Sequence, residues 1–465
     1  MASIAIDEPS DRRAPPGPAG LPLLGITAQV RKDPLGFFAR IASDYEGLSV
    51  LPLGLDKIYL LNSPDTLKHV FITNWRNYRK SDFYNKLRPF FGEGIVTSDG
   101  DLWRRQRQQM NPAFHRDSLQ RIGQIMRTAT SDKILAWRDR PADQTFDMAA
   151  EMTELTLAIV MESLFDADIK GRTATIAHAV DTMTEVFERR VWAVPDFHDK
   201  PVSPLYWRQR RARAALDKIV FDIIERRVQS GDAGSDLLGM LLSAKDPDTG
   251  EGMSVTQLRD ETTTLLATGH ESTANATVWV LYTISQYPEI EAKIREEIDR
   301  VCGNGTPTDE ELRNLTYQRM VIEEVMRLYP PAWTASRTAI EDDVIDGYDI
   351  PAGSNVMVSP FVIQRNPRYW PDPERLDPMR FTPEQQANRP KFAYIPFAGG
   401  PRNCIGANFA MMELQIVITM LLQAFRLELA PQPPIEREAF ISIRPKHGIK
   451  FTSHAIQVAV SAEAA

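Results

Sequence analysis

The chain has 465 residues, a formal net charge of −8 and 43% hydrophobic residues, which is typical of an ordinary globular protein. The acidic balance argues against general nucleic-acid binding, and the two cysteines, Cys302 and Cys404, exclude a disulfide framework or a cysteine-rich zinc site. The N-terminus has acids where a secretory signal has positive charge, and no run of about 18 apolar residues predicts a membrane-spanning helix. We therefore expect a cytoplasmic protein with no membrane anchor and no nucleic-acid partner.

The first 100 residues combine short helical and strand-like elements. Residues 1–13 are expected to be a disordered tail, and the proline-rich stretch that follows cannot be helical, because proline fixes φ and lacks an N–H. Strand-like runs fall within about 45–62, and Ser63-Pro64 is typical of a helix start. The stretch 81–100 mixes aromatics with glycine and proline, which predicts an irregular loop with partial helix.

Helical patterns dominate the middle of the chain. They predict helices over about 101–139, 146–165, 173–192, 205–230, 254–287, 289–301 and 308–328. The longest begins at Ser254, where Gln257 completes capping-box spacing, and meets no proline before Pro288. Such a helix has about 30 residues and spans about 45 Å, enough to cross a whole domain.

After Pro330-Pro331 the pattern returns to short strands and turns, followed by a last long helix at about 405–425. We assign 45–62, 335–360 and 426–460 to a small β-rich subdomain. No repeat or linker divides the chain. The sequence therefore predicts a mainly α fold, in which 14–465 form a single domain with a large helical part.

Cys404 lies in a loop of unusual composition. In Phe397-Ala-Gly-Gly-Pro-Arg402-Asn-Cys404-Ile-Gly406, two glycines, a proline and an arginine precede the thiol, and a helix pattern begins within three residues. Glycines permit close approach of the backbone, and the positive end of a helix favours a thiolate. A lone buried cysteine is usually only a small hydrophobe, but this loop can hold a thiolate against a flat partner.

The pattern Phe-x-x-Gly-x-Arg-x-Cys-x-Gly resembles the haem-binding loop of the cytochrome P450 family, in which a cysteine thiolate is the proximal iron ligand. The resemblance implies a haem-thiolate monooxygenase that holds haem b between the long central helix and the cysteine loop, with Cys404 as metal ligand. The family motifs run from 103 to 406 in family order, so the resemblance covers nearly the whole chain.

The middle of the longest helix is unusually polar for a central helix. The run Ala267-Thr268-Gly269-His270-Glu271 resembles the first part of the family's oxygen-activation motif. The resemblance implies that Thr268 and Gly269 face the haem, the glycine allowing a flat cofactor to approach the backbone. Many relatives have alanine or glycine where this chain has Thr268. His270 is one step round the helix, which favours a structural hydrogen-bonder over a metal ligand.

The last residues of that motif carry the implied catalytic groups. The resemblance implies proton delivery to bound oxygen by Ser272 with Glu271 as its partner, and Thr273 as an alternative. Serine at 272 departs from the usual threonine and lacks the methyl group that restricts the rotamer.

Several arginines match further family positions. Trp103 and Arg107 are four residues apart on one helix face, and they resemble the family's contact to a haem propionate. The resemblance extends the same role to Arg402 and Arg337, and three arginines suit two carboxylates. Phe397 and Gly406 complete the cofactor-binding residues.

Glu324 and Arg327 are three residues apart and resemble, together with Arg380 in Pro378-Met-Arg-Phe, the family's acid–arginine cluster. The resemblance implies a structural brace for the haem loop.

The substrate is indicated only by apolar residues in loops. They suggest a pocket for a lipid-like, terpenoid or steroid compound, lined by Phe83, Leu87, Phe90 and Val191, with Tyr84, Phe91, Trp192 and Phe197 nearby. Arg88 could meet a carboxylate or face water.

The chain contains no flavin or nicotinamide module, so electrons for O2 are expected from a ferredoxin or flavodoxin with an NAD(P)H-dependent reductase. Arg104 and Arg105 could form a basic docking face for it or an ordinary solvated one. The alternatives are a peroxide-using, isomerising or dehydrating haem-thiolate enzyme, and a non-catalytic haem-thiolate sensor or carrier. The polar residues Gly269, Glu271 and Ser272 favour the monooxygenase.

Overall fold

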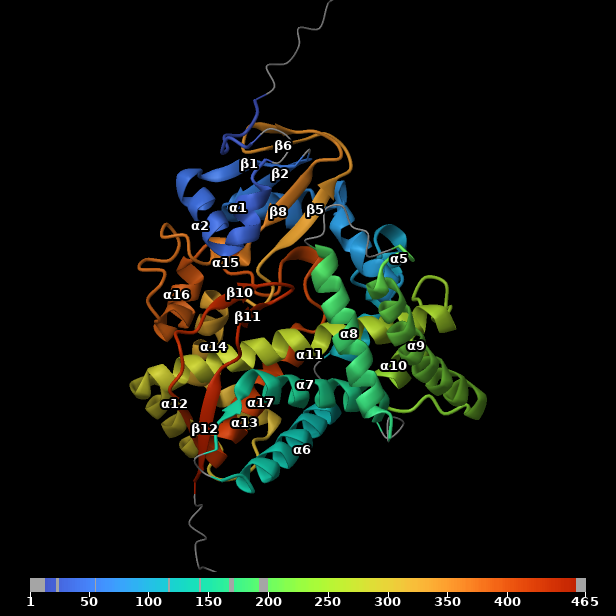
Figure 1. Ribbon diagram of the computed structural model, residues 1–465, viewed down its shortest axis with the longest axis vertical. Coiled ribbons are helices and arrows are strands. Elements are labelled where there is room, and N and C mark those ends of the chain that lie inside the picture. Colours follow the sequence, from blue (N-terminus) through green and yellow to red (C-terminus); the bar gives the residue numbers. More distant parts are fainter. Residues whose placement is uncertain are drawn as a thin grey trace, which may run out of the picture. The chain divides into compact units, whose positions relative to one another are not determined.

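The computed structural model describes residues 13–21, 25–54, 56–115, 118–141, 144–166, 171–191 and 200–456 (Figure 1). The predicted tail at 1–13 lies outside the described residues except for Arg13. The chain forms two compact units, which we describe separately. The first is drawn from Met1–Phe83, Thr334–Glu374 and Asn388–Asn403, and the second from Tyr84–Trp333, Arg375–Ala387 and Cys404–Ala465.

The first unit is built on a five-stranded sheet. Its strand order is β1 (Gly47–Leu53), β2 (Asp56–Asn62), β8 (Asn355–Val358), β5 (Ala335–Ala339) and β3 (Tyr78–Lys80). Only β2 and β8 are parallel; the other neighbours are antiparallel. Apolar side chains from the sheet, including Leu48, Leu61 and Val356, are buried in a common core with Phe71.

Short elements complete the first unit. They are α1 (Thr27–Lys32), α2 (Pro34–Asp44), α3 (Pro64–Lys68), η1 (His69–Thr73), η2 (Trp75–Asn77), β6 (Asp343–Ile345), β7 (Tyr348–Ile350), α15 (Pro360–Ile363), η7 (Lys391–Ala393) and η8 (Gly400–Arg402). The helix start expected at Ser63-Pro64 is confirmed: the Ser63 hydroxyl accepts the Thr66 N–H, 3.2 Å away, and Pro64 opens the first turn of α3. The chain leaves this unit through η3 (Asp82–Leu87).

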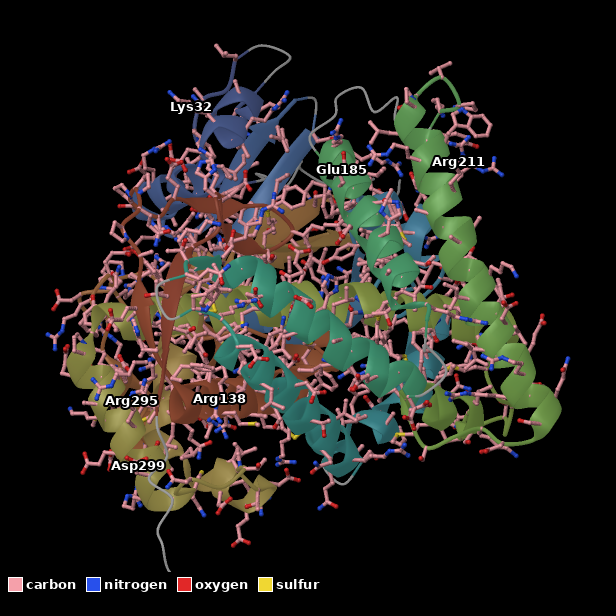
Figure 2. All side chains as sticks on the ribbon, turned by 60° about the horizontal axis from the view of Figure 1, so that its bottom comes forward. Lys32, Arg138, Glu185, Arg211, Arg295 and Asp299 are labelled. Carbon is pink, nitrogen blue, oxygen red and sulfur yellow. The ribbon has the colours of Figure 1, made fainter. Side chains whose placement is uncertain are left out.

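The second unit is mainly helical. Its helices are α4 (Arg88–Phe91), α5 (Gly100–Met110), η4 (Asn111–Phe114), α6 (Leu119–Arg138), α7 (Met148–Phe165), α8 (Thr173–Val191), α9 (Pro204–Ser230), α10 (Leu237–Ser243), α11 (Val255–Gln286), α12 (Pro288–Val301), α13 (Asp309–Asn314), α14 (Thr316–Leu328), η6 (Pro378–Phe381), α16 (Pro383–Asn388) and α17 (Ala407–Ala424). Glu185 on α8 and Arg211 on α9 mark two helices that lie side by side (Figure 2).

The long helix α11 is the centre of the second unit. It begins after Ser254, whose hydroxyl accepts the Gln257 N–H at 3.1 Å, and runs for 32 residues, as the sequence predicts. It packs against α7, α9, α14 and α17 (Figure 1). The helix that follows the cysteine loop is therefore packed directly on the helix that carries the predicted oxygen-activation residues.

Two predicted helices are interrupted. The expected run at 101–139 breaks between α5 and α6, because Pro112 lacks an N–H and opens the short helix η4. The run at 308–328 divides into α13 and α14 at Leu315, whose backbone leaves the helical region (φ −78°, ψ 67°).

The strands at the C-terminus differ from the predicted subdomain. Of the predicted range 426–460, the described residues 426–456 do not join the five-stranded sheet: β12 (Lys450–Ala455) pairs with β9 (Phe425–Leu429) and with β4 (Phe146–Asp147) within the second unit. The strands β10 (Arg437–Ala439) and β11 (Ile443–Pro445) form a separate hairpin. β12 lies between β4 and β9, with Phe451 opposite Phe146 on one side and Leu429 on the other. The pairing of these apolar residues therefore joins the strands to one another and not to the five-stranded sheet.

Among the described residues, α17 alone has the length and apolar composition of a membrane-crossing helix. However, 67% of it is buried inside the protein, as in a core helix.

Candidate active site

The cysteine loop of the first unit is shaped by backbone that needs glycine. Ala398 and Gly400 both have positive φ, +58° and +73°. A Cβ at Gly400 would lie 1.9 Å from the carbonyl oxygen of Phe71, and one at Gly399 would lie 2.5 Å from the Phe392 ring. The loop can therefore lie against η1 only with these glycines in place.

Cys404 lies two residues after η8 and three before α17. Its side chain is exposed, yet burial among protein atoms is the largest influence on its pKa. An accessible sulfur with many protein atoms around it lies in a recess and not on a convex surface. Such a recess leaves the sulfur within reach of a ligand.

The electrostatics around the sulfur are mixed. Burial raises the pKa of the Cys404 thiol, while the Gly406 N–H, which bonds the sulfur, and the positive charge of Arg107 oppose this rise. The predicted stabilisation of a thiolate is thus present but smaller than the effect of burial. A metal cation at the sulfur deprotonates a thiol outright, so these groups fit an iron-bound thiolate.

Gly406 supports the same fit. A Cβ at this position would meet only the Cys404 sulfur, at 4.0 Å. The described protein residues would therefore leave room for a side chain at this position. A flat group bound over the sulfur would fill that room, and it would explain why the residue is glycine.

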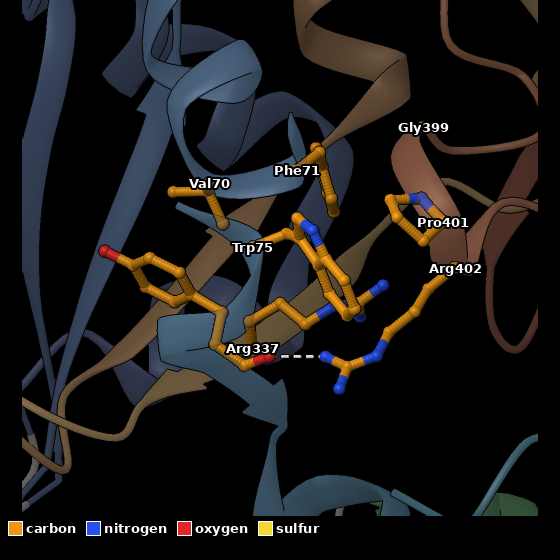
Figure 3. A pocket seen from close by; sticks show the side chains of 8 residues that line it. Val70, Phe71, Trp75, Arg337, Gly399, Pro401 and Arg402 are labelled. Carbon is orange, nitrogen blue, oxygen red and sulfur yellow. Dashed lines mark hydrogen bonds between the residues drawn. The ribbon is translucent and has the colours of Figure 1, made fainter. Parts of the chain in front are cut away.

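Arg337 and Arg402 line one small pocket of the first unit, with room for roughly one water molecule (Figure 3). Arg402 donates to the Tyr78 carbonyl, and its guanidinium lies 5.7 Å from the centre of the Trp75 ring. Arg337 is 6% exposed and donates to the Ser336 carbonyl at 2.8 Å. Among the described residues Arg337 has no carboxylate partner, so the pocket offers positive charge to an anionic group, as a propionate site requires.

On α5, Trp103 is buried and Arg107 is half-buried. Burial lowers the pKa of Arg107, and the negative charge of the Cys404 thiolate opposes that change. Arg107 therefore lies near enough to Cys404 for the two charges to interact. Arg104 and Arg105 are exposed, as the helix pattern predicts.

The predicted distal residues divide between two sides of α11. Thr268 is exposed and Ser272 half-buried, and their hydroxyls donate to the carbonyls of Thr264 and Thr268 at 2.8 and 3.2 Å. Positions four apart lie about 40° apart round a helix. Thr268 and Ser272 therefore form one accessible hydroxyl face.

Thr273 and Gly269 point elsewhere. Thr273 is 3% exposed, and its hydroxyl donates to the Gly269 carbonyl at 3.3 Å. A Cβ at Gly269 would lie 3.1 Å from Val160 of α7. Packing against α7 thus explains the glycine, whereas the sequence suggested close approach of the cofactor. His270 is buried and its Nδ1 lies 3.0 Å from the Leu266 carbonyl, in agreement with a structural role.

Glu271 has partners that the sequence did not indicate. The Ser442 hydroxyl donates to its Oε1 at 2.7 Å, and the Asn275 amide donates to Ser442 at 2.7 Å. Ser442 lies 171 residues away in the turn between β10 and β11, so no local pattern could have revealed it.

The acid–arginine cluster forms as the sequence predicts. Glu324 and Arg327 are fully buried and paired through two hydrogen bonds of 2.7 and 2.8 Å. Arg380 approaches Glu324 at 3.5 Å, and the Asp377 N–H donates to the same carboxylate at 2.9 Å. The cluster fastens η6 to α14; its role as a brace for the haem loop stays a prediction.

The predicted substrate residues come from η3, α4 and α8, and their shared role as a substrate pocket stays a prediction. Phe90 is 1% exposed and packs edge-on against Phe187 of α8, 6.3 Å away. Phe83 is 42% exposed, Phe397 is half-buried, and both belong to the first unit. Tyr84 and Leu87 are half-buried and Phe91 is buried, whereas the side chain of Val191 and residues Trp192 and Phe197 lie outside the described residues.

Comparison with known proteins agrees with this geometry. The family model for cytochrome P450 matches residues 15–452. The putative cytochrome P450 132 of Mycobacterium tuberculosis is 32% identical over 84% of this chain and 86% of its own. The cyclooctat-9-en-7-ol 5-monooxygenase of Streptomyces melanosporofaciens is 31% identical over 91% of this chain and 93% of its own. The crystal structure of the cytochrome P450DA heme domain has the same fold, with a TM-score of 0.86 over 96% of this chain and 98% of that one, at 24% identity.

The fold and the cysteine loop define a haem-thiolate protein. The chain belongs to the cytochrome P450 family and is a haem-thiolate monooxygenase with haem b as its cofactor. Iron bound to haem and to a cysteine thiolate activates dioxygen, so that one oxygen atom enters the substrate and the other leaves as water.

Proposed function

We propose that this monooxygenase inserts one oxygen atom of O2 into an apolar small molecule, of the lipid-like, terpenoid or steroid class. The proposal rests chiefly on Cys404, held in a recess beside the Gly406 N–H and the Arg107 charge. The name of the Streptomyces relative, a cyclooctat-9-en-7-ol 5-monooxygenase, supports hydroxylation of a compound of this kind.

The residues of this chain would divide the work in the following way. Cys404 holds the iron, and Arg107, Arg337 and Arg402 bind the haem carboxylates. On the distal side, Ser272 passes protons and orders water together with Thr268, because these two hydroxyls are accessible. Thr273 is buried and serves the helix itself.

Glu271 supplies the carboxylate of the proton path. Ser442 and Asn275 hold its side chain in place. The hydrogen bond that Ser442 donates to Oε1 fixes the orientation of the carboxylate, which then exchanges protons with water near Ser272.

Electrons come from a separate ferredoxin or flavodoxin and its NAD(P)H-dependent reductase in the cytoplasm. The exposed Arg104 and Arg105 on α5, next to the helix position of Arg107, support an acidic partner on that side.

Substrate-induced spin-state changes of the purified haem protein, screened against fatty acids, terpenoids and steroids, test this function. We expect an apolar compound to shift the spectrum, and a surrogate ferredoxin, its reductase and NADPH to convert it to a product heavier by one oxygen atom. Tight binding without product, or product only with added peroxide, would contradict the proposal.

A further inference from the structure

The segment 88–95 runs along the first half of α11, close to the accessible hydroxyl face. A Cβ at Gly94 would lie 2.1 Å from the Thr264 hydroxyl and 2.8 Å from the Asp260 carbonyl oxygen. The Thr264 carbonyl in turn accepts the Thr268 hydroxyl. The segment therefore contacts α11 one helical turn before Thr268, so it borders the site where substrate would react.

Two carboxylates on α11 hold the backbone of this segment. The Glu93 N–H donates to Asp260 and the Ile95 N–H donates to Glu261, both at 2.8 Å. Hydrogen bonds from backbone N–H groups to carboxylates are stronger than those between neutral groups. Gly92 turns the chain with φ +55°, and a Cβ there would lie 2.2 Å from the Asp260 carboxylate.

Asp260 belongs to a line of charges that reaches α9, which we call the clasp: Arg213, Asp217, Arg259 and Asp260. Arg259, 2% exposed, donates to Asp260 at 2.7 Å and to Asp217 at 2.6 Å. Arg213 approaches the other oxygen of Asp217 at 3.3 Å and donates to the Pro89 carbonyl at 2.7 Å.

Both ends of the clasp thus bond the backbone of the same segment. Arg213 of α9 donates to the Pro89 carbonyl, and Asp260 of α11 accepts from the Glu93 N–H. Between these points Phe90 packs against Phe187 of α8. A buried arginine is costly without its acidic partners, so the inner pair of Arg259 and Asp260 depends on Asp217 staying in place. Arg213 and Asp217, which are partly exposed, are the members whose loss would loosen the segment without exposing the core.

We propose that the clasp positions the segment 88–95 as a wall of the substrate site and thereby limits entry of bulky ligands. Arg213 and Asp217 are positioning residues: they act through the backbone of the segment and need not touch substrate. This inference rests on the proposed function, because it takes the region beside Thr268 to be the place of reaction.

The test compares the haem-loaded variants Arg213→Met and Asp217→Asn with wild type. Arg210→Met is the matched control, since Arg210 lies one turn earlier on α9 and contacts Tyr206 and Trp207 instead of the segment. Hydrogen exchange of the Glu93 and Ile95 amides reports the segment directly. Association of imidazole and of 4-phenylimidazole with the ferric haem reports entry of a small and a bulky ligand.

We expect faster exchange of both amides in Arg213→Met and Asp217→Asn. We also expect about fivefold faster association of 4-phenylimidazole, the factor that corresponds to losing one partly exposed charge-assisted hydrogen bond, with little change for imidazole. The double variant should loosen the segment at least as much as either single variant, because Arg213 also donates to Pro89 and Asp217 also accepts from Arg259. Unchanged exchange in these variants, or an equal effect in Arg210→Met, would overturn the inference.

The two proposals fail in different ways. Hydrogen exchange tests the clasp without turnover, whereas the spectrum of the haem complex tests the proposed function. If the Glu93 and Ile95 amides exchange faster but the association rate of 4-phenylimidazole is unchanged, the clasp lies away from the substrate site and its role there is refuted.

Discussion

The cysteine loop and the middle of α11 supply the two sides of the proposed chemistry, yet they are specified in different ways. The loop depends on backbone contacts: Gly400 must be glycine to pass the Phe71 carbonyl, and the Gly406 N–H bonds the sulfur. The middle of α11 depends on side chains of other elements, because Ser442 holds Glu271 and Val160 faces Gly269.

This difference separates what fixes the cofactor from what adjusts the reaction. Backbone contacts leave the loop little freedom, so substitutions there should remove the haem or the fold. The distal side chains are held by side-chain hydrogen bonds, Ser442 to Glu271 and Ser272 to the Thr268 carbonyl, so substitutions there should change coupling while the protein stays folded. Variants of the loop and of α11 test this contrast.

The largest expected effect on stability is in the buried cluster that fastens η6 to α14. Glu324→Gln removes the negative charge that pairs with the buried Arg327. Because an unpaired buried charge is costly, we expect the free energy of unfolding to fall by about 3–5 kcal/mol. Urea unfolding measures it. Glu323→Gln on the same helix breaks a surface pair with Arg319, which is 61% exposed, and should cost no more than about 1 kcal/mol. Equal losses would show that the buried cluster is not a brace.

The next largest effect concerns proton delivery. Ser272→Ala should lower product formed per electron by about tenfold or more, because it removes the accessible hydroxyl, while haem content stays unchanged. NADPH consumption, peroxide release and product are measured together. Thr273→Val removes a buried hydroxyl and should remain coupled. The reverse result, with uncoupling only in Thr273→Val, would move the proton path to Thr273.

A third effect is a dependence of stability on pH from Glu413 of α17. Among the described residues neither oxygen of this buried carboxyl has a hydrogen-bond partner, and burial raises its pKa well above the ordinary value. Between the unfolded and folded pKa values the native state keeps a proton that the unfolded state has lost. The free energy of unfolding therefore falls as pH rises through this window.

Glu413→Gln has no proton to lose, so its stability relative to wild type should increase from about pH 5 to pH 8, by about 1–3 kcal/mol. Thermal unfolding across this range checks the trend, and the exposed Glu384→Gln serves as control. A difference that is constant with pH would mean that Glu413 does not titrate differently in the folded state.

The smallest effect is expected at Ser442. Ser442→Ala removes one hydrogen bond from Glu271 and should reduce coupling by about fivefold, less than Ser272→Ala. Product per NADPH is the measurement, and Ser243→Ala, which loses a hydroxyl bonded within α10, is the control. Full coupling in Ser442→Ala would mean that the orientation of Glu271 does not matter.

Local signals in the sequence predicted much of the fold. The caps at Ser63 and Ser254, and Pro288 after the end of α11, act within a few residues of the backbone they control. The break at Pro112 carried such a signal too, but the helical pattern on both sides concealed it. The pairing of Phe451 with Phe146 could not be predicted, because strand register depends on tertiary packing.

The same limit applies to the site. The spacing around Cys404 predicts that it is the iron ligand, and spacing on the helices placed Glu324 beside Arg327. The accessible face of α11 became clear only from burial, which separates Ser272 from Thr273. The hydrogen bond from Ser442 and the clasp join segments far apart in the chain, for which a single sequence contains no pattern.

The most direct test of the central claim is the absorption spectrum of the reduced carbon monoxide complex. With a Cys404 thiolate on the iron, wild type should show the far red-shifted Soret band of a cysteinate-ligated haem, and Cys404→His should bind haem but lose that band. A red-shifted band retained by Cys404→His, or absent from wild type, would contradict the assignment of Cys404 as the iron ligand.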